Sequence, residues 1–132
     1  FFRTLVQYDV PVDAGLVADI EPTLEAAEET MALLLGRSEP PTAVFCTNDT
    51  IAAGAMKAAI RSGLKVPQDV AIVGFDDSYI SRVMEPELTT VRIDAAEMGR
   101  LAIQKLFDLM EGAPVEERLI EIPTELIIRA SS

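Results

Sequence analysis

The sequence contains no histidine and no tryptophan, and its single cysteine is Cys46, so several kinds of site are excluded at once. Zinc sites and nucleophilic catalysis that relies on histidine need side chains that this chain does not have. A disulfide within the chain is impossible, and the position of Cys46 inside an apolar segment favours a buried core residue. Only carboxylates remain for acid–base chemistry.

Basic residues are also scarce, because 11 Lys and Arg stand against 22 Asp and Glu and give a net charge of −11. Binding to a phosphate backbone depends on Lys and Arg that displace counterions, so this chain is not expected to hold DNA itself. No apolar run approaches the ~20 residues of a membrane-spanning helix. The first residues lack the order of a signal peptide. We therefore expect a cytoplasmic protein without membrane contact.

A glycine-rich phosphate-binding loop is missing as well, and no cofactor is expected. Of the 132 residues, 49% are hydrophobic and 25% are charged, a composition typical of one folded domain with a sizeable core. The sequence has no initiator Met and opens directly in residues of helical character. We expect residues 1–132 to be a fragment of a longer protein.

Two apolar segments without alternation, Thr42–Cys46 and Val70–Phe75, are typical of central strands in a parallel sheet that helices cover on both faces. Between them, the residues from about Thr50 to Ser62 predict a helix, and Gly63 and Pro67 end it. Strand, helix and strand together form a right-handed crossover unit. The predicted fold class is α/β, with a three-layer doubly wound parallel sheet.

Further elements are expected on both sides of this unit from hydrophobic periodicity and from helix start and stop residues. They are a helix over 2–8, a strand over Leu16–Ile20, a helix from Pro22 to Gly36, a helix from about Ala95 to Glu111, and strands over Glu121–Pro123 and Leu126–Arg129. Asp94 is the expected N-cap of the long helix, with Glu97 completing a capping box. This helix has a wide apolar side, so it must dock on a sizeable surface.

The predicted helix over Thr50–Ser62 has few polar residues, and a single sheet face cannot bury all of it. Either the helix is internal or its second face meets another subunit. A homodimer is the preferred explanation, because closed two-fold dimers are the commonest oligomers. The residues assigned to this dimer interface are Ile51, Ala52, Ala55, Tyr79 and Met84.

Two polar pairs, Asn48-Asp49 and Asp76-Asp77, directly follow the two predicted strands. Ligands of open parallel sheets bind outside the carboxyl ends of the strands, where both pairs would lie. The first pair could merely cap a helix, which is worth roughly 1 kcal/mol, and the second could merely form a turn. Alternatively, these side chains accept hydrogen bonds from ligand hydroxyls, as suits a polyol or a sugar. The aromatic residues that flank the second pair, and that could stack on a ligand or pack in the core, are Phe75 and Tyr79.

An enzyme is the more remote interpretation of the same two pairs. Carboxylates at neighbouring strand ends could hold a magnesium ion for phosphoryl transfer. The sequence lacks the Lys after a later strand that a phosphoacceptor pocket would need, and it lacks a phosphate loop. We therefore expect neither a metal site nor catalysis.

Taken in order, these residues resemble the effector-binding domain of the lactose-repressor (LacI/GalR) family of bacterial transcription regulators. The resemblance covers nearly all of the chain, and its most specific parts are PTAVFCTNDTIAAGAMKAAIRSGLKVPQDVAIVGFDD, PELTTVRIDAAEMGRLAIQKLF and IPTELIIR. It implies one lobe of a periplasmic-binding-protein-like fold, in which an effector cleft lies between two α/β lobes. It also implies that residues 91–115 belong to the amino-terminal lobe, and that DNA is bound only through an amino-terminal domain absent from this sequence.

The resemblance further implies the residues of the effector site. Asn48 and Asp76 match positions that commonly bind effector, Ile93 lies beside the hinge and cleft, and Phe75 stands where an aromatic or apolar residue is usual. With Asp49 from the polar pair, these are the expected ligand-binding residues. Two departures from the family pattern are Asp9, where glycine is common, and Ile93, where several sugar binders have a polar residue.

The implied function is that of a transcriptional regulator that catalyses no reaction. A small molecule, expected to be a sugar or a related metabolite, closes the two lobes and shifts the DNA-binding heads of a dimer by population shift. The alternative with the same fold is a periplasmic solute-binding protein that serves a transporter.

Overall fold

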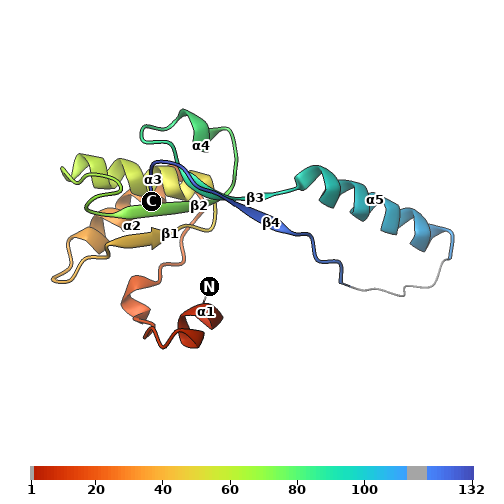
Figure 1. The fold of residues 1–132 in the computed structure, drawn as a ribbon, viewed down its shortest axis with the longest axis horizontal. Coiled ribbons are helices and arrows are strands. Elements are labelled where there is room, and N and C mark those ends of the chain that lie inside the picture. Colours follow the sequence, from red (N-terminus) through yellow and green to blue (C-terminus); the bar gives the residue numbers. More distant parts are fainter. Residues whose placement is uncertain (1, 113–118) are drawn as a thin grey trace.

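A computed structural model describes residues 2–112 and 119–132 of the chain. Its elements, in chain order, are α1 (Phe2–Gln7), the 3₁₀ helix η1 (Ala14–Leu16), α2 (Leu24–Leu35), β1 (Ala43–Phe45), α3 (Asp49–Arg61), β2 (Ala71–Asp76), α4 (Ile80–Val83), β3 (Thr89–Ile93), α5 (Ala95–Met110) and β4 (Thr124–Ile127). Figure 1 shows a body built around the sheet and, apart from it, the long helix α5.

The four strands form one sheet in the order β1-β2-β3-β4. β1, β2 and β3 are parallel, with Val44 opposite Ile72 and Gly74 opposite Thr90. β4 runs antiparallel to β3, so that Arg92 lies opposite Glu125. The predicted α/β class is confirmed, although the sheet is mixed rather than purely parallel. Within the described residues β1 is an edge strand, where the sequence predicted a central one.

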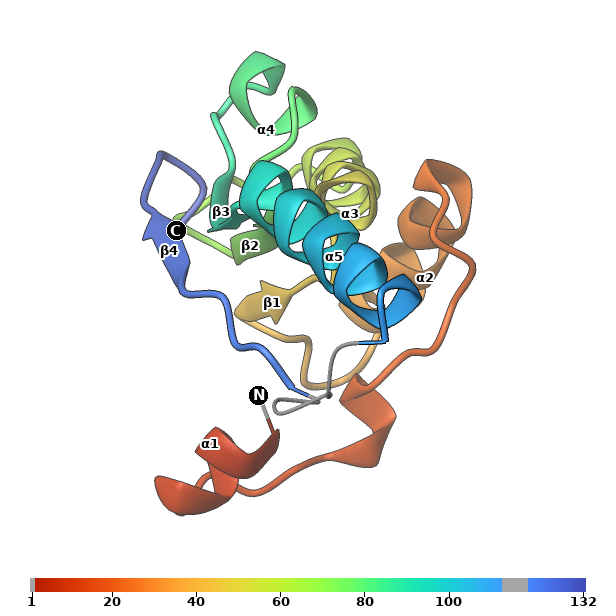
Figure 2. The same ribbon diagram turned by 90° about the vertical axis from the view of Figure 1, so that its right-hand side faces the viewer.

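The helix α3 packs on the sheet with one side and on α2 with another, and all three share one core. On the sheet side, Met56 and Ala59 pack with Ile72 of β2. On the opposite side, a Cβ added to Gly54 would lie 2.6 Å from the Cβ of Ala27 and closer still to a backbone oxygen of α2. Gly54 therefore permits α2 to pack directly on the α3 backbone, and Figure 2 shows the two helices side by side.

This packing overturns part of the predicted dimer interface. Ala52 and Ala55 retain 0% and 3% of their exposure, because they are enclosed by the core of their own chain. Ile51 and Met84 are partly buried against the same core, and Tyr79 alone among the five predicted interface residues is exposed. The apolar second face of α3 is explained by the internal helix α2.

The segment that precedes α2 differs from the prediction in two respects. No strand forms over Leu16–Ile20, since Asp13 caps the short helix η1 and Arg37 binds both Asp13 and the Gly15 carbonyl, each at 3.0 Å. The helix α2 begins after an N-cap at Thr23, so Pro22 stands before the helix and not at its first position. Local polar contacts thus set both boundaries.

The amino-terminal segment, from α1 through η1, approaches the sheet face that α2 and α3 do not cover (Figure 1). Between this segment and β1 and β2 lies a cavity of about 790 Å³, with Val73 and the partly exposed Phe45 on its sheet side. After α1, Asp9 adopts φ 54°, a left-handed conformation that favours glycine. A residue with this φ is one that glycine adopts more easily than Asp9 does, in keeping with the glycine that the family resemblance led us to expect here.

The strands β3 and β4 lead out of the body to α5, whose residues are all at least partly exposed (Figure 1). Asp94 caps the helix as predicted, accepting a hydrogen bond from the Glu97 amide at 2.9 Å. The Glu97 carboxylate pairs with Arg100 instead of completing a capping box. The large apolar residues exposed on α5 are Met98, Ile103, Leu106, Phe107, Leu109 and Met110.

Beyond β4 the chain returns to the body and is fixed between β2 and β3. The buried Ser131 hydroxyl donates to the Ile72 carbonyl at 2.6 Å and accepts from the Thr89 amide at 2.8 Å. This anchoring of the chain end holds Arg129 against the carboxyl edge of the sheet, where the candidate site lies.

Candidate functional site

The candidate site lies where the parallel strands β1 and β2 end, next to the first turn of α3. Asn48 precedes α3 and its Oδ1 accepts a hydrogen bond from the Ile51 amide at 2.8 Å. Asn48 is therefore the N-cap of this helix, which is the capping role that the sequence analysis considered for the pair Asn48-Asp49. The amide nitrogen of the same half-buried side chain is the group that could donate to a ligand.

Asp49, the second member of this pair, is a structural residue of the lobe. Its side chain is buried, and the residue retains 1% of its exposure. Oδ1 accepts a hydrogen bond from the Thr90 hydroxyl at 2.6 Å, and Oδ2 accepts one from the Ser78 amide at 2.7 Å. Gly74 makes room for this carboxylate, because any Cβ there would collide with it. The prediction that Asp49 faces a ligand is thus corrected: both of its oxygens serve internal contacts.

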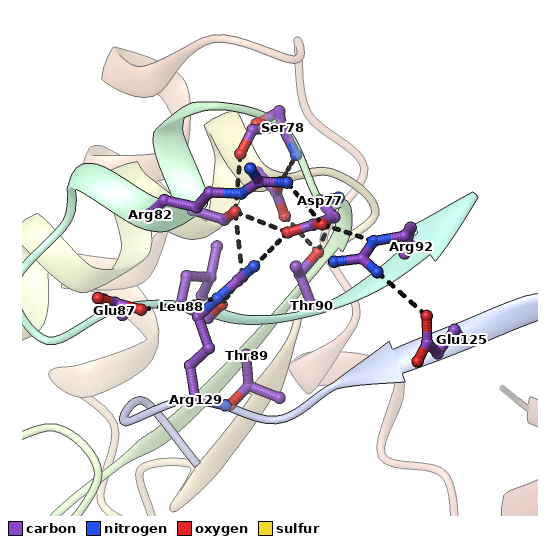
Figure 3. Close-up of polar contacts among 12 residues, drawn as sticks. Asp77, Ser78, Arg82, Glu87, Leu88, Thr89, Thr90, Arg92, Glu125 and Arg129 are labelled. Carbon is purple, nitrogen blue, oxygen red and sulfur yellow. Dashed lines mark hydrogen bonds and ion pairs between the residues drawn. The ribbon is translucent and has the colours of Figure 1, made fainter. Parts of the chain in front are cut away.

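Asp77 is the centre of a group of buried and half-buried charges, drawn in Figure 3. Its side chain is 2% exposed. Oδ1 accepts from Arg129 and, at 3.1 Å, from the Ser81 hydroxyl; Oδ2 accepts from Arg92 at 2.8 Å and from Arg82 at 3.1 Å. We call these five residues the Asp77 cluster. Burial alone would raise the pKa of Asp77, but the hydrogen bonds from the cluster lower it well below its ordinary value, so the carboxylate is ionised.

Asp76 stands next to this cluster but is exposed at the edge of the sheet. Its φ is 107° and that of Asp77 is 47°, both in the left-handed region that non-glycine residues rarely adopt. This backbone allows two adjacent aspartates to have opposite environments. Partial burial, and then the negative charge of Asp49, raise the pKa of Asp76 above its ordinary value. Hydrogen bonds from ligand hydroxyls would stabilise the charged form of this carboxylate, which its surroundings disfavour.

The remaining predicted ligand-binding residues lie near this edge. Phe75 is half-buried on β2, and Ile93 is half-buried at the end of β3, opposite Thr124. Tyr79 is 81% exposed directly before α4. The structure therefore places Asn48 and Asp76 at the ends of adjacent strands, with Ile93 two strands away from β1 along the sheet.

Sequence reasoning missed the arginines. Arg82, Arg92 and Arg129 come from α4, from β3 and from the segment after β4, and three of only 11 basic residues meet at one carboxylate. The available signal was the scarcity of positive charge, and it pointed only to Arg129, because this residue ends the predicted strand over Leu126–Arg129. Thr90, which bridges Asp49 and the Asp77 amide, had no comparable signal.

Within residues 2–112 and 119–132, no group of three or more His, Cys, Asp or Glu is placed to hold a metal ion. No helix in this part of the chain is long and apolar enough to cross a membrane.

Comparison with known proteins identifies the group to which this chain is similar. It is 39% identical over 132 residues to the HTH-type transcriptional repressor CytR of Escherichia coli strain K12, covering 100% of this chain and 39% of that protein. A solved regulatory protein of the LacI family from Chloroflexus aggregans is 37% identical with a TM-score of 0.90, covering 98% of this chain and 47% of that one. The transcriptional regulator CelR in complex with cellobiose is 32% identical with a TM-score of 0.91, covering 98% of this chain and 40% of that one.

The chain thus spans less than half the length of these relatives. Their matches extend along nearly all of it, through the sheet, the candidate site and α5. The family model of periplasmic binding protein-like domains matches residues 1–132. The chain therefore belongs to the family of periplasmic binding protein-like domains, as a partial effector-binding domain of the LacI type.

Proposed function

We propose that this chain is the effector-sensing part of a LacI-type DNA-binding transcriptional regulator. Its ligand is a small molecule rich in hydroxyl groups, a sugar or a related metabolite. The observation that carries the proposal is the pair formed by Asn48 and Asp76, which present an amide and an exposed carboxylate at the ends of adjacent parallel strands. Asp76 accepts hydrogen bonds from ligand hydroxyls, and Asn48 donates one.

This edge supplies one wall of the proposed cleft, and a second lobe supplies the other. We assign residues 91–115 to that second lobe, because the described part of this segment leaves the body through β3 and exposes the apolar side of α5. Such an exposed apolar patch marks a surface that packs against another element. Ile93, at the point of departure, lies beside the hinge, and Phe75 lines the lobe beneath the ligand.

The proposed protein acts as a homodimer in the cytoplasm and contacts DNA through a separate domain. Of the residues first assigned to the dimer interface, Tyr79 remains the best candidate, since it is 81% exposed and Val83 of α4, four residues later, is exposed as well. Ligand binding favours the closed arrangement of the lobes and shifts the population of dimers that bind DNA. The protein catalyses no reaction.

Two other functions were considered from the sequence. A transporter-associated solute-binding protein would have the same fold, but the relatives named above are transcriptional regulators. A magnesium-dependent phosphotransfer enzyme would need free carboxylates, whereas Asp49 and Asp77 have both oxygens engaged. The regulator is therefore favoured over both.

The test is calorimetric titration of the full-length protein that carries this chain with a panel of neutral sugars and sugar phosphates. The variants are Asp76→Ala and, as a matched control, Asp69→Ala, which removes an exposed aspartate at the opposite end of β2. A charge-assisted hydrogen bond contributes about 1.5–3 kcal/mol, so Asp76→Ala should weaken binding at least about tenfold. The control should bind like the original protein.

Two results would contradict the proposal. If no member of the panel binds, the ligand is not a sugar, and the proposed ligand class is wrong. If a sugar binds and Asp76→Ala leaves its affinity unchanged, the cleft does not use the carboxyl edge of β2.

A further inference from the structure

We infer that Asp77 is a positioning residue that couples the turn bearing Asp76, residues 76–79, to the strands β3 and β4 that lead to α5. For its role in regulation the inference rests on the proposed function. The geometry on which it stands is the Asp77 cluster, in which one buried carboxylate is bound by arginines from α4, from β3 and from the segment after β4 (Figure 3).

The link to β3 and β4 passes through Arg92. On β3, its Nε donates to Asp77 Oδ2 at 2.8 Å, while its Nη1 donates to Oε2 of Glu125 on β4 at 3.1 Å. Arg92 and Glu125 are also direct cross-strand neighbours. A rotation of this strand pair relative to the body would therefore displace the guanidinium that binds Asp77.

The link to the chain beyond β4 passes through Arg129, which is 11% exposed. Besides Asp77, this side chain donates to the Leu88 carbonyl at 2.7 Å and to the Ser81 hydroxyl at 3.1 Å. These contacts hold it to the start of β3 and to α4. Arg129 is therefore enclosed within the body, whereas Arg92 is 44% exposed and joins Asp77 to β4.

The turn is held by hydrogen bonds from the two backbone amides that directly follow Asp76. The Asp77 amide donates to the Thr90 hydroxyl of β3 at 3.3 Å, and the Ser78 amide donates to Asp49 of α3. Because Thr90 also donates to Asp49, the turn, β3 and α3 form one hydrogen-bonded unit. A change in β3 reaches the exposed Asp76 carboxylate through these bonds, and a ligand on Asp76 acts back on β3 by the same path.

The variant that tests this coupling is Arg92→Gln in the full-length protein. Removing the Asp77 carboxylate would leave three arginines without their partner and destabilise the whole body, whereas Arg92 is half-exposed and its loss is mild. The matched control is Arg100→Gln, which removes an Arg paired with Glu97 on α5, the helix that lies apart from the body in Figure 1. Arg92→Lys tests whether a positive charge at this position is enough to keep the turn coupled to β4.

The measurement is amide hydrogen exchange followed by mass spectrometry without ligand. We expect Arg92→Gln to speed exchange in residues 76–81 and 124–129 by about two- to fivefold, as for the loss of a half-exposed ion pair. Exchange in α2 and α3 should not change, and Arg92→Lys should restore part of the protection. A merely structural loss would instead speed exchange throughout the body. Unchanged exchange in residues 76–81 of Arg92→Gln would overturn the inference.

The same samples are then measured with each neutral sugar of the panel. In the original protein and in Arg100→Gln, a sugar that binds should slow exchange both in residues 76–81 and in β4. In Arg92→Gln it should slow exchange in residues 76–81 alone, and equal slowing of β4 would also overturn the inference. If no sugar binds the original protein, the proposed ligand class fails, while the exchange without ligand still decides whether Arg92 couples the turn to β4.

Discussion

Replacing the buried Asp49 by Ala is the sharpest test of whether this residue serves the lobe or a ligand. The substitution leaves the Thr90 hydroxyl and the Ser78 amide without their acceptor. Each buried donor left unsatisfied costs about 1–3 kcal/mol. Asp49 also places a negative charge in the first turn of α3, which is worth roughly 0.3–1 kcal/mol more. Relief from burying a carboxylate offsets part of this sum. We expect a net loss of about 3 kcal/mol.

Urea unfolding of the chain, followed by far-ultraviolet circular dichroism, measures this loss as a lower midpoint with an unchanged slope. Thr90→Val serves as the partner substitution, and the double variant should show a coupling free energy of about 1 kcal/mol or more. Asp49→Asn keeps one acceptor oxygen and should lose less than Asp49→Ala. The reasoning would be refuted if Asp49→Ala unfolded at the same urea concentration as the unsubstituted chain, while the same substitution in the full-length protein abolished ligand binding.

Two further predictions concern the packing of α3 and the charge of Asp77. Gly54→Ala should lower the free energy of unfolding by about 1–2 kcal/mol, because overpacking against the α2 backbone exceeds the gain in helix propensity. Gly99→Ala on α5, whose Cβ meets no atom of the described chain within 4 Å, should cause no loss in the same urea experiment. Because the folded-state pKa of Asp77 is lowered, its contribution to stability is present above the unfolded-state pKa of about 3.9 and is lost as the pH falls below it. The original chain should therefore lose more stability between pH 5 and pH 2 than Asp77→Asn does, and equal losses would contradict the assigned ion pairs.

The elements predicted best from the sequence were those with a local cause. The apolar runs around Val44 and Ile72 became strands, and Asp94 capped α5 where its position predicted it. β3 was not predicted, because the short segment Thr89–Ile93 carries polar residues whose partners lie elsewhere in the chain. Thr89 accepts from the Arg129 amide, 40 residues away, and Thr90 donates to Asp49, 41 residues away. Tertiary contacts of this kind leave no periodic signal.

The sequence correctly placed both polar pairs at the carboxyl edge of the sheet. It did not predict which member of each pair is buried and which is open to a ligand. In each pair one aspartate is buried and bound within the lobe, and the residue before it lies closer to the open edge. Which member is buried depends on the left-handed backbone at Asp76 and Asp77 and on arginines that the chain supplies much later. The sequence also did not predict that α2 covers α3, for a similar reason. This packing depends on the close approach of a distant helix to Gly54.

The site and the exposed helix α5 have a common structural origin. β3 contributes Thr90 to the hydrogen bonds that hold the β2–α4 turn, and a few residues later it leaves the body toward α5. The strand that fixes Asp76 is thus also the strand whose direction sets the position of any second lobe. A ligand that contacts both walls of the proposed cleft must act on the two ends of β3 together, since a hydrogen bond at one end constrains the direction of the other. This shared strand gives a physical route by which occupancy of a small site could change the arrangement of two lobes without any change in the core that α2 and α3 form.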